Sequence, residues 1–462
     1  MKKTAWMIFA FICICGLIMC MFVSCTKDQP KREDDIPKPN NTSDSVFVKV
    51  YIDGSEIKVI STDISHGYTI TPPEKPEDIT TNPNSKKYFY GWFIDPDFQN
   101  PLSESTKFRN GGAIYGKLIS VDPANFKYEV DFGKATITGY KGTVPTVLVI
   151  PPFIDPFPVE GIRKDAFSNN RQIVKVIFFN GIESITGFNG CDGIKDIYIP
   201  ESVKSIGEYA FNECYNLRSV IFEENSQCKT IGAYAFRSTH LTHIKIPSAV
   251  QCIEEDAFSR CSYLQEITFE ELSQCNSIGS SAFWGCEALR GIAIPDSVKD
   301  IGNRAFGNCS SLRYNTYMNA SYIGNSNNPY IYLVKCNTAD LSSCVISSQT
   351  KFIGNSAFEG RIGERIEIPD SVISIQYAAF KNCRTLKNIN IPSSVIRIEE
   401  AAFAGCTAIG GIRIPSSVKY MGMMVFQDWK STQTICFEVG EMQNGWSGYW
   451  KAGCWAKIYW NS

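Results

Sequence analysis

The stretch "IPESVKSIGEYAFNECYNLRSVIF", Ile199 to Phe222, is one complete unit of an internal repeat. When similar units are aligned on their phenylalanine, they follow one another about every 23 residues, which is the spacing of a stacked repeat array. The aligned phenylalanines are Phe167, Phe188, Phe211, Phe236, Phe258, Phe283, Phe306, Phe358, Phe380, Phe403 and Phe426. Such a period predicts a solenoid in which each unit forms one coil.

The pattern of apolar residues within the unit predicts how one coil is built. The tail Leu217–Phe222 alternates apolar and polar residues, which predicts a short strand, and the proline that follows in most units ends it. The Ser-Val-x-x-Ile-Gly segment then carries the chain round the edge, and the Ala-Phe segment forms a tight helical turn or a short extended piece opposite. The residues expected to point inward are Val203, Ile206, Ala210, Phe211, Cys214, Leu217, Val220 and Phe222. One coil cannot bury this face alone, whereas stacked coils share a continuous core.

The consensus "IPxSVxxIGxxAFxxCxxLxxIxIP" resembles the leucine-rich repeat of the BspA-like surface proteins, and the resemblance runs from about residue 125 to the C-terminus. It implies a repeat solenoid, a right-handed leucine-rich-repeat superhelix of short parallel strands with short helical or extended backs. We expect this domain over 121–462. Residues 126–142 resemble an N-terminal hairpin cap, and 431–460 resemble a closing end piece. A tyrosine-rich interruption at about 314–345 is expected to form a hairpin around the Gly-Asn-Ser-Asn-Asn-Pro turn.

The N-terminus has the layout of an export signal. Lys2 and Lys3 precede an apolar run that ends in Phe-Val-Ser-Cys25, which resembles a bacterial lipobox. Residues 1–25 are therefore expected to be a lipoprotein signal peptide with Cys25 lipidated; an uncleaved anchor or a plainly cleaved signal is the alternative. Residues 26–45 are too polar to fold and predict a flexible tether. Their acidic and polar start resembles the sorting signal of Bacteroides surface lipoproteins, which implies an outer-membrane lipoprotein exposed at the cell surface.

A different pattern occupies residues 46–120. Two alternating runs on either side of Gly54 predict a hairpin. Together with the words "GWF", which ends at Phe93, and "IYGK", which ends at Lys117, they resemble a small bacterial surface repeat of Listeria and Bacteroides proteins, which implies a β-grasp-like module. Trp92 is interpreted as a core residue of this module rather than as a stacking platform for a ligand. The nearby acidic residues Asp95, Asp97 and Glu104 lack the spacing of a calcium-binding EF-hand loop.

Composition argues against several classes of function. The net charge of -2 comes from 45 basic and 47 acidic residues, and the chain has no basic stripe of the kind that binds nucleic acid. It contains neither a phosphate-binding loop nor a nucleophile elbow, so we expect no enzymatic activity and no cofactor. Of the three histidines, His66 stands apart, and His240 and His243 flank Leu241 on a predicted strand and are interpreted as surface residues. No Cys-x-x-Cys pair is present, and no metal site is expected.

Many of the 18 cysteines follow the repeat. Seven of them lie three residues after an aligned phenylalanine: Cys191, Cys214, Cys261, Cys286, Cys309, Cys383 and Cys406. Because Thr239, Asn170 and Arg361 occupy the same place elsewhere, we interpret it as a small, inward-facing position filled by buried thiols. Disulfides between coils, which are within reach, remain the alternative. Cys228 and Cys275 are expected in another core position. Cys436 and Cys454 are candidates for a disulfide bridge, with both outcomes left open.

The residues that flank the inward positions of each strand should face solvent on one side of the sheet. They mix charged, amide, aromatic and small types, unlike a uniformly charged solubilising face. We therefore hypothesise a concave protein-binding surface centred on His243, Lys245 and Glu266, with a merely solvated sheet as the alternative. The full candidate set is Tyr198, His243, Lys245, Glu266, Thr268, Arg365, Glu367, Asn388, Asn390 and Arg413.

The interruption supplies a second group of candidates, the aromatic residues Tyr314, Tyr317, Tyr322, Tyr330 and Tyr332. They either stack on sugar rings or pack the hairpin onto its neighbours. The family resemblance implies adhesion to host or neighbouring-cell macromolecules. A glycan-binding accessory lipoprotein of a polysaccharide uptake system is the second hypothesis, and a structural spacer in the cell envelope is the third. The expected partner is an extracellular protein or glycan, and contact with a membrane is expected only through the lipid anchor. The oligomeric state is left open.

Overall fold

The computed structural model describes residues 45–52, 55–63, 87–93 and 112–461. The predicted signal peptide with Cys25, residues 26–44 of the tether, His66, Asp95, Asp97 and Glu104 lie outside the described residues, as does the side chain of Trp92. Among the described residues, no helix has the length and apolar character needed to span a bilayer.

The N-terminal strands form one small mixed sheet. They are β1 (Ser45–Ile52), β2 (Ser55–Asp63), β3 (Lys87–Phe93) and β4 (Gly112–Ser120). Their order is β2-β1-β4-β3, with β1 and β4 parallel in the centre and the other two pairs antiparallel. The hairpin predicted around Gly54 corresponds to the β1–β2 pair. Membership of the module in a β-grasp-like family stays a prediction.

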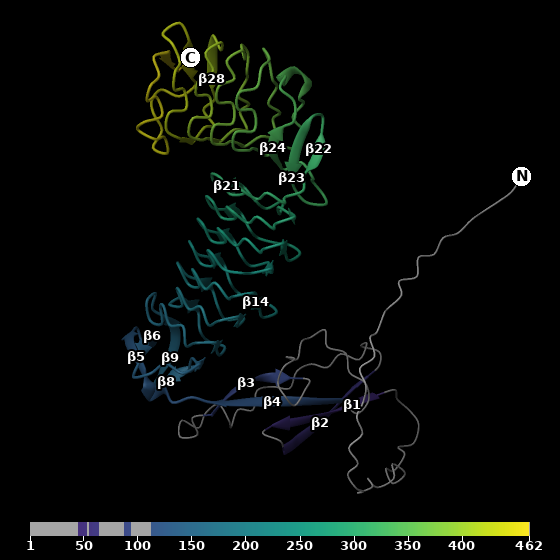
Figure 1. Cartoon of the computed structure of the whole chain (residues 1–462), viewed down its shortest axis with the longest axis vertical. Coiled ribbons are helices and arrows are strands. Elements are labelled where there is room, and N and C mark those ends of the chain that lie inside the picture. The colour runs from purple at the N-terminus through teal and green to yellow at the C-terminus, as the bar shows by residue number, and fades with distance from the viewer. Residues whose placement is uncertain (1–44, 53–54, 64–86, 94–111, 462) are drawn as a thin grey trace, which may run out of the picture.

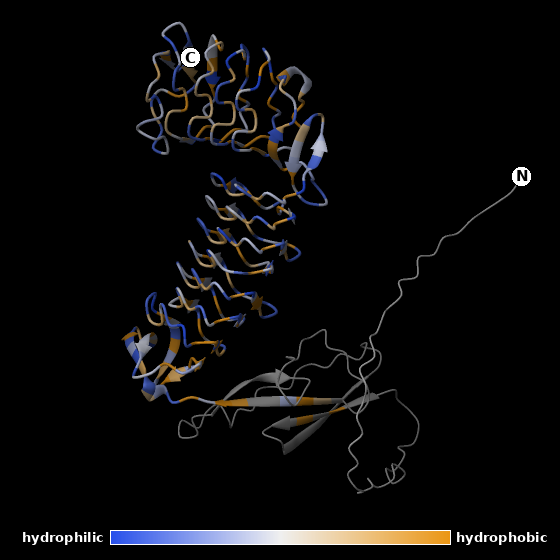
Figure 2. Ribbon diagram, in the orientation of Figure 1, coloured by the Kyte–Doolittle hydropathy of each residue, from blue (hydrophilic) through white to orange (hydrophobic). Residues whose placement is uncertain are grey.

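The rest of the chain is a solenoid in two segments joined at an angle by the interruption (Figure 1). The first segment runs from Phe126 to Arg313 and the second from Tyr332 to Asn461. Each has its own hydrophobic core, formed by the inward side chains of successive coils. Figure 2 shows hydrophobic residues recurring from coil to coil along both segments. The predicted repeat solenoid is confirmed.

The predicted strand after each leucine is present in most coils, and we call these the face strands. In the first segment they are β7 (Val147–Val149), β10 (Lys175–Ile177), β12 (Asp196–Ile199), β14 (Ser219–Phe222), β16 (His243–Ile246), β18 (Glu266–Phe269) and β20 (Gly291–Ile292). In the second they are β28 (Gly411–Ile414), β30 (Thr434–Phe437) and β31 (Lys457–Trp460). They form separate small sheets, β7-β10, β12-β14, β16-β18-β20 and β28-β30-β31. Within each sheet the strands pair in parallel, in the register that places aligned repeat positions side by side.

A second parallel ladder, which the sequence pattern did not predict, runs through the Ser-Ile pairs. Its strands in the first segment are β11 (Ser184–Ile185), β13 (Ser205–Ile206), β15 (Thr230–Ile231), β17 (Cys252–Ile253), β19 (Ser277–Ile278) and β21 (Asp300–Ile301). An equivalent ladder in a separate sheet of the second segment contains β25 (Phe352–Ile353), β26 (Ser374–Ile375), β27 (Arg397–Ile398) and β29 (Tyr420–Met421). The glycine after the isoleucine allows the coils to approach. A Cβ at Gly302 would lie 2.3 Å from the Ser280 backbone nitrogen. We call these the ladder strands.

The backs of the coils are chains of hydrogen-bonded turns, so of the two forms expected for them, helical or extended, the helical one is wrong. In the coil of Phe211, the backbone N–H groups of Tyr209, Phe211 and Glu213 donate to carbonyls of the next coil. Tyr209 and Glu213 also have positive φ angles of 56° and 55°. A helix would need these N–H groups to bond four residues back within the same coil, and it has no left-handed residues. Stacking between coils therefore replaces helix formation.

Phenylalanine rings stack along the core at the predicted positions. In the first segment the centroids of successive rings from Phe167 to Phe306 lie 5.4, 5.6, 5.6, 5.3, 5.5 and 5.9 Å apart. A second stack runs from Phe358 to Phe426. Rings between these ends are fully buried. The stack breaks at the interruption, where Phe306 meets the ring of Tyr332 edge-on instead.

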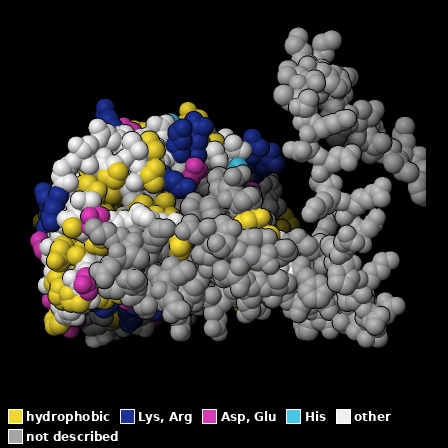
Figure 3. Space-filling model, turned by 90° about the horizontal axis from the view of Figure 1, so that it is seen from below, with side chains coloured by type: hydrophobic (Ala, Val, Ile, Leu, Met, Phe, Trp, Pro, Cys, Tyr) yellow, Lys and Arg dark blue, Asp and Glu magenta, His cyan; other side chains and the backbone are white. Residues whose placement is uncertain are grey.

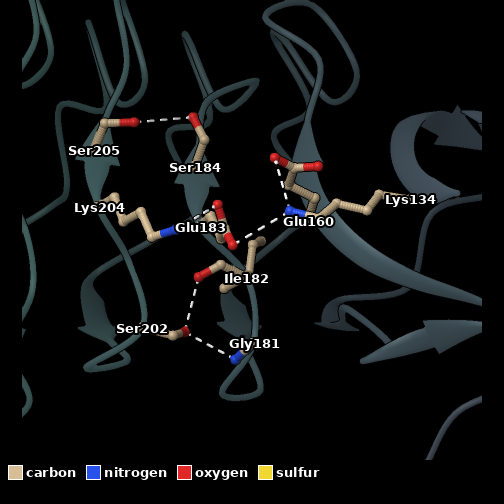
Figure 4. A network of polar contacts seen from close by, with 9 residues as sticks. All are labelled: Lys134, Glu160, Gly181, Ile182, Glu183, Ser184, Ser202, Lys204 and Ser205. Atoms are coloured by element: carbon tan, nitrogen blue, oxygen red, sulfur yellow. Dashed lines mark hydrogen bonds and ion pairs between the residues drawn. The ribbon is translucent and has the colours of Figure 1, made fainter. Parts of the chain in front are cut away.

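Caps close the outer end of each segment. A short 3-10 helix, η3 (Pro123–Asn125), leads into the predicted hairpin, β5 (Phe126–Asp131) and β6 (Lys134–Tyr140). The strands β8 (Phe153–Ile154) and β9 (Phe157–Ile162) join it to β11. Figure 4 shows the Glu183 carboxylate between the ammonium groups of Lys204, at 2.9 Å, and Lys134, at 3.4 Å. These bonds hold the pKa of Glu183 below its ordinary value.

The predicted end piece is also present, with Trp446 and Trp450 buried against Phe437.

The interruption forms the predicted hairpin and turns the solenoid. Its strands are β22 (Asn315–Tyr317), β23 (Ala320–Ile323) and β24 (Tyr332–Cys336). Each pairs antiparallel with the next, and β24 also pairs in parallel with β25. The 3-10 helix η4 (Leu341–Ser343) follows. Ile323, Ile331, Tyr332 and Phe352 cover the end of the first core. The second segment is thus packed across the last coil of the first instead of continuing its stack.

Candidate functional site

The face strands display the candidate residues as the alternation predicts. On β16, His243 and Lys245 are exposed while Ile244 and Ile246 are buried, and Glu266 and Thr268 repeat this pattern on β18. His243 lies beside Glu266, and Lys245 lies beside Thr268, in the parallel register. The sequence therefore places these four side chains together on one face.

This face lies on the outer side of the bend between the segments, and its concave shape stays a prediction. The contacts inside the bend involve the ladder side. The Gln376 amide donates to the Ile301 carbonyl, and Arg397 lies 3.4 Å from the Asp300 carboxylate. Since ladder strands of both segments meet there, the face strands point away from the inner angle (Figure 1). The angle arises from the interruption, whose packing no repeat position specifies.

Several candidate side chains are already engaged in ion pairs. Lys245 lies 2.9 Å from Glu270, which is in the next coil. In the second segment Arg365 pairs with Glu367. By contrast, His243 and Glu266 have no ion pair within the described part of the chain. A charged group of a partner could therefore contact His243 and Glu266 without breaking an existing ion pair.

The remaining candidates lie apart from this pair. Tyr198 lies on β12, two face strands before β16. Arg365, Glu367, Asn388, Asn390 and Arg413 are exposed on the second segment, where Arg365 and Asn388 form an isolated bridge. The candidate set is thus divided between the two segments by the interruption. Figure 3, seen from below, shows Lys and Arg, Asp and Glu, and hydrophobic side chains on the uncovered part of that side of the molecule.

A hollow of about 720 Å³ lies where the face meets the interruption. Its lining combines candidate residues with residues that the sequence pattern did not single out. The lining residues are His243, Gln265, Glu266, Ile267, Thr268, Arg290, Gly291, Ile292, Ala293, Arg313, Asn315, Gly324, Asn325, Ser326 and Pro329. Three of the predicted face residues, His243, Glu266 and Thr268, therefore border a cavity that the predicted hairpin completes.

Two tyrosines of the interruption pack its strands instead of facing solvent. Tyr322 and Tyr332 are buried, and the Tyr332 hydroxyl donates to the Gln376 side-chain oxygen at 2.9 Å. Burial raises the pKa of Tyr322 to about 12. A sugar ring has no access to these two rings. For Tyr322 and Tyr332 the hypothesis of stacking on a sugar is therefore wrong, and the alternative, that they pack the hairpin onto its neighbours, is confirmed.

The other tyrosines of the interruption are less enclosed. Tyr330 contacts both Tyr317 and Tyr322, with ring centroids 5.3 and 5.4 Å apart. Tyr314 is 38% exposed, and the Lys335 ammonium lies 5.7 Å from its ring centre. Tyr314 is thus the most accessible of the five candidates.

The cysteines three residues after each phenylalanine are buried free thiols, as predicted. All seven donate to the phenylalanine carbonyl of the preceding coil, with Sγ to oxygen distances of 3.0 to 3.2 Å. At the same position, the Trp429 indole nitrogen donates to the Phe403 carbonyl at 2.9 Å. The position therefore selects an inward donor that satisfies a buried carbonyl, which explains why cysteine recurs.

Other cysteine predictions have a definite outcome in the structure. Cys228 and Cys275 are buried in the core as expected. Cys436 and Cys454 are half-buried free thiols, so the candidate bridge between them is absent. Within residues 112–461 and the three shorter described ranges, no group of three or more His, Cys, Asp or Glu is placed to hold a metal ion.

Thiol titration is expected to separate two sets of cysteines. Burial raises the pKa of Cys261 to about 11, so this thiol stays protonated at neutral pH and is a poor nucleophile. In the folded protein a thiol reagent should first modify the half-buried Cys252, Cys436 and Cys454. After unfolding without reductant, at least the fourteen described cysteines should react. Fewer than about ten reactive thiols would contradict the buried ladder.

The comparisons with known proteins agree with this architecture. The sequence matches the BspA type leucine-rich repeat region, in six copies, over residues 153–228, 186–313, 229–361 and 329–444. The matched regions cover more than half of the chain, and the protein belongs to this family. A search of curated proteins found no match.

Solved structures of bacterial proteins are similar to the chain over most of its length. The pneumococcal vaccine antigen PcpA is 20% identical, with 73% of this chain and 84% of that chain covered and a TM-score of 0.37. A leucine-rich repeat protein from Bacteroides ovatus is 23% identical, with 74% and 90% covered and a TM-score of 0.41. A leucine-rich cell surface protein from Faecalibacterium prausnitzii is 24% identical, with 64% and 89% covered and a TM-score of 0.33. These similarities carry no conclusion about the ligand.

The residues missed by sequence reasoning are Arg290, Arg313 and Asn325. The two arginines directly follow the leucines of their repeats, as Arg218 does, so their repeat position was visible in the sequence. What distinguishes them is that the interruption folds back beside them. Asn325 lies in the turn of the predicted hairpin, but no repeat pattern indicates that it reaches Ile294, just after β20.

Proposed function

We propose that this protein is a cell-surface protein whose solenoid binds an extracellular protein of a host or a neighbouring cell. The observation that supports this most is the border of the hollow, where the exposed and unpaired His243 and Glu266 meet the interruption. A fold does not specify a ligand, so the proposal depends on this surface and not on the family alone. No reaction chemistry is part of it.

The anchor forms part of the same proposal. Lipidation of Cys25 would hold the protein in the outer membrane, and residues 26–45 would keep the solenoid away from the lipid surface. An adhesive role needs the solenoid on the outer face of the cell, which is the location that the acidic and polar segment after Cys25 implies.

The glycan-binding hypothesis has less support. It depended on tyrosines of the interruption, and burial removes Tyr322 and Tyr332 from any ligand surface. A carbohydrate platform requires an accessible aromatic face, and of the five tyrosines Tyr314 offers the most exposed one. Protein binding is therefore the function that we put forward.

Binding is tested with the full-length protein and its triple variant His243→Ala, Lys245→Ala, Glu266→Ala. Intact cells displaying each form are incubated with host matrix proteins and with polysaccharides, and the captured material is identified after crosslinking. We expect the triple variant to lose at least tenfold in capture of the protein ligand, about 1.4 kcal/mol of binding free energy.

The matched control changes Lys229, Gln251 and Glu255 to alanine, because these exposed residues lie in neighbouring coils but off the face strands. Capture by the control should equal that of the unchanged protein. Equal capture by the triple variant would show that this face is not the binding surface, and retention of polysaccharide alone would favour the glycan hypothesis.

A further inference from the structure

The three-stranded sheet of β16, β18 and β20 ends at β20. Gly291 and Ile292 pair with Glu266 and Ile267 of β18, as the register requires. In the following coil the Arg313 N–H still donates to the Arg290 carbonyl, at 3.0 Å. Beyond Arg313 the chain leaves the sheet, since β22 pairs with β23 instead. One side of β20 is thereby left without a neighbouring strand.

A side chain of the interruption closes the far end of this free edge. The Asn325 amide nitrogen donates to the Ile294 carbonyl at 2.7 Å and to the Asp296 carboxylate at 3.0 Å. Between the two ends lies Ile292, whose backbone N–H and C=O have no partner on this side among the described residues. In a parallel sheet, inward residues at this position bond to the next strand. A short stretch of edge backbone is therefore open for pairing.

The hollow lies along this open edge. Gly291 on β20 and Ala293 just after it are its outward residues, and their small size leaves room above the strand. A Cβ placed on Gly291 meets no atom within 4 Å. Asn315 and Pro329 stand opposite, on the interruption. The space between the edge of β20 and the interruption suits an extended peptide chain, which supplies its own backbone donors and acceptors.

The charges around the hollow indicate what the chain should carry. Arg290 and Arg313 are exposed at the end where the edge begins, and neither has an ion pair within the described ranges. His243 and Glu266 lie on the neighbouring strands, so one carboxylate stands among these groups. Two guanidinium groups in adjacent coils match a carboxylate, which arginine binds through paired hydrogen bonds.

We propose that the free edge of β20 binds an extended peptide segment of the protein partner, with a carboxylate of that segment at Arg290 and Arg313. The segment pairs with the Ile292 backbone and fills the space above Gly291. This inference rests on the proposed function and adds to it the chemistry of the partner, an acidic strand-forming segment.

The probe is a library of acetylated hexapeptides in which one position is fixed as Asp or Glu, with a matched library in which it is fixed as Lys or Arg. Both are passed over the immobilised full-length protein, and bound peptide is quantified. We expect the acidic library to be retained at least tenfold more than the basic one. Arg290→Glu combined with Arg313→Glu should abolish or reverse this preference, and Gly291→Tyr should abolish retention by filling the hollow.

Two control variants separate the site from general effects. Arg218→Glu reverses a charge at the same repeat position in another coil, and Gly410→Tyr adds a ring where a Cβ also meets no atom within 4 Å. Both should retain the acidic library as the unchanged protein does, with circular dichroism confirming that every variant is folded. Absence of retention, equal retention of the two libraries, or full retention by Gly291→Tyr would overturn the inference.

The outcome is distinguishable from failure of the proposed function. If the His243, Lys245 and Glu266 triple variant loses the protein ligand while Gly291→Tyr keeps it, the face binds a partner but the strand edge does not. If both variants keep the ligand, neither the face nor the strand edge is the binding surface. Loss in both, together with the preference for acidic peptides, supports the edge as part of the binding surface.

Discussion

Replacing Phe258 by alanine is expected to lower the free energy of unfolding by about 3–5 kcal/mol, the usual cost of deleting a buried phenylalanine side chain. Phe258 is fully buried and stacks between Phe236 and Phe283, with ring centroids 5.3 and 5.5 Å away. The loss leaves a cavity and separates two parts of the ring stack. Because each coil contacts only its neighbours, the substitution should also weaken the coupling between the coils on its two sides within the first segment.

The measurement is urea unfolding followed by circular dichroism, with the free energy of unfolding of each variant obtained from the midpoint and the slope of its transition. Phe306→Ala is the matched control, since Phe306 stands at the end of the stack and is only partly buried. It should cost clearly less than Phe258→Ala. A loss below about 1 kcal/mol at Phe258 would mean that the ring stack does not carry the stability of the core.

Replacing Tyr332 by alanine is expected to have a comparable cost and also to loosen the bend. The Tyr332 ring meets Phe306 edge-on at 5.5 Å, and its hydroxyl bonds to Gln376, which itself donates to the Ile301 carbonyl. Deleting the ring removes a buried side chain, at about 3–5 kcal/mol, and leaves the Gln376 side-chain oxygen without its donor. The two segments should then unfold in separate transitions.

Small-angle X-ray scattering and urea unfolding together test this. Tyr332→Ala should broaden the distribution of interatomic distances and split the unfolding curve, whereas Tyr332→Phe, which keeps the ring, should cost about 1–3 kcal/mol and preserve the shape. Tyr314→Ala is the control, because that ring is 38% exposed. An unchanged scattering profile for Tyr332→Ala would show that the bend is held by other contacts.

Much of the scaffold followed from the spacing of residues. Period-two alternation after each leucine placed Ile244 and Ile246 inside and His243 and Lys245 outside, because a strand turns alternate side chains to opposite faces. The recurrence of cysteine in phase with phenylalanine predicted buried thiols, although the carbonyl that each thiol satisfies became visible only with the coils stacked. Repeat phase therefore specifies what lies in the core.

The ladder and the bend did not follow from the sequence, for different reasons. A two-residue strand such as Ser205–Ile206 is too short for alternation to reveal it, and only its stacked neighbours define it. The bend depends on contacts such as that between Gln376 and Ile301, which lie 75 residues apart. The hollow shares this origin, since Arg290 looks like any residue after a repeat leucine until the interruption folds beside it.

Hydrogen exchange of the full-length protein, alone and saturated with a captured protein ligand, tests most directly whether the interrupted end of the face is the binding surface. We predict slower exchange of backbone amides in residues 289–296, 313–317 and 324–329, with the Ile292 amide among those most protected. Protection confined to the ladder strands or to the C-terminal cap, with residues 289–296 unchanged, would contradict it.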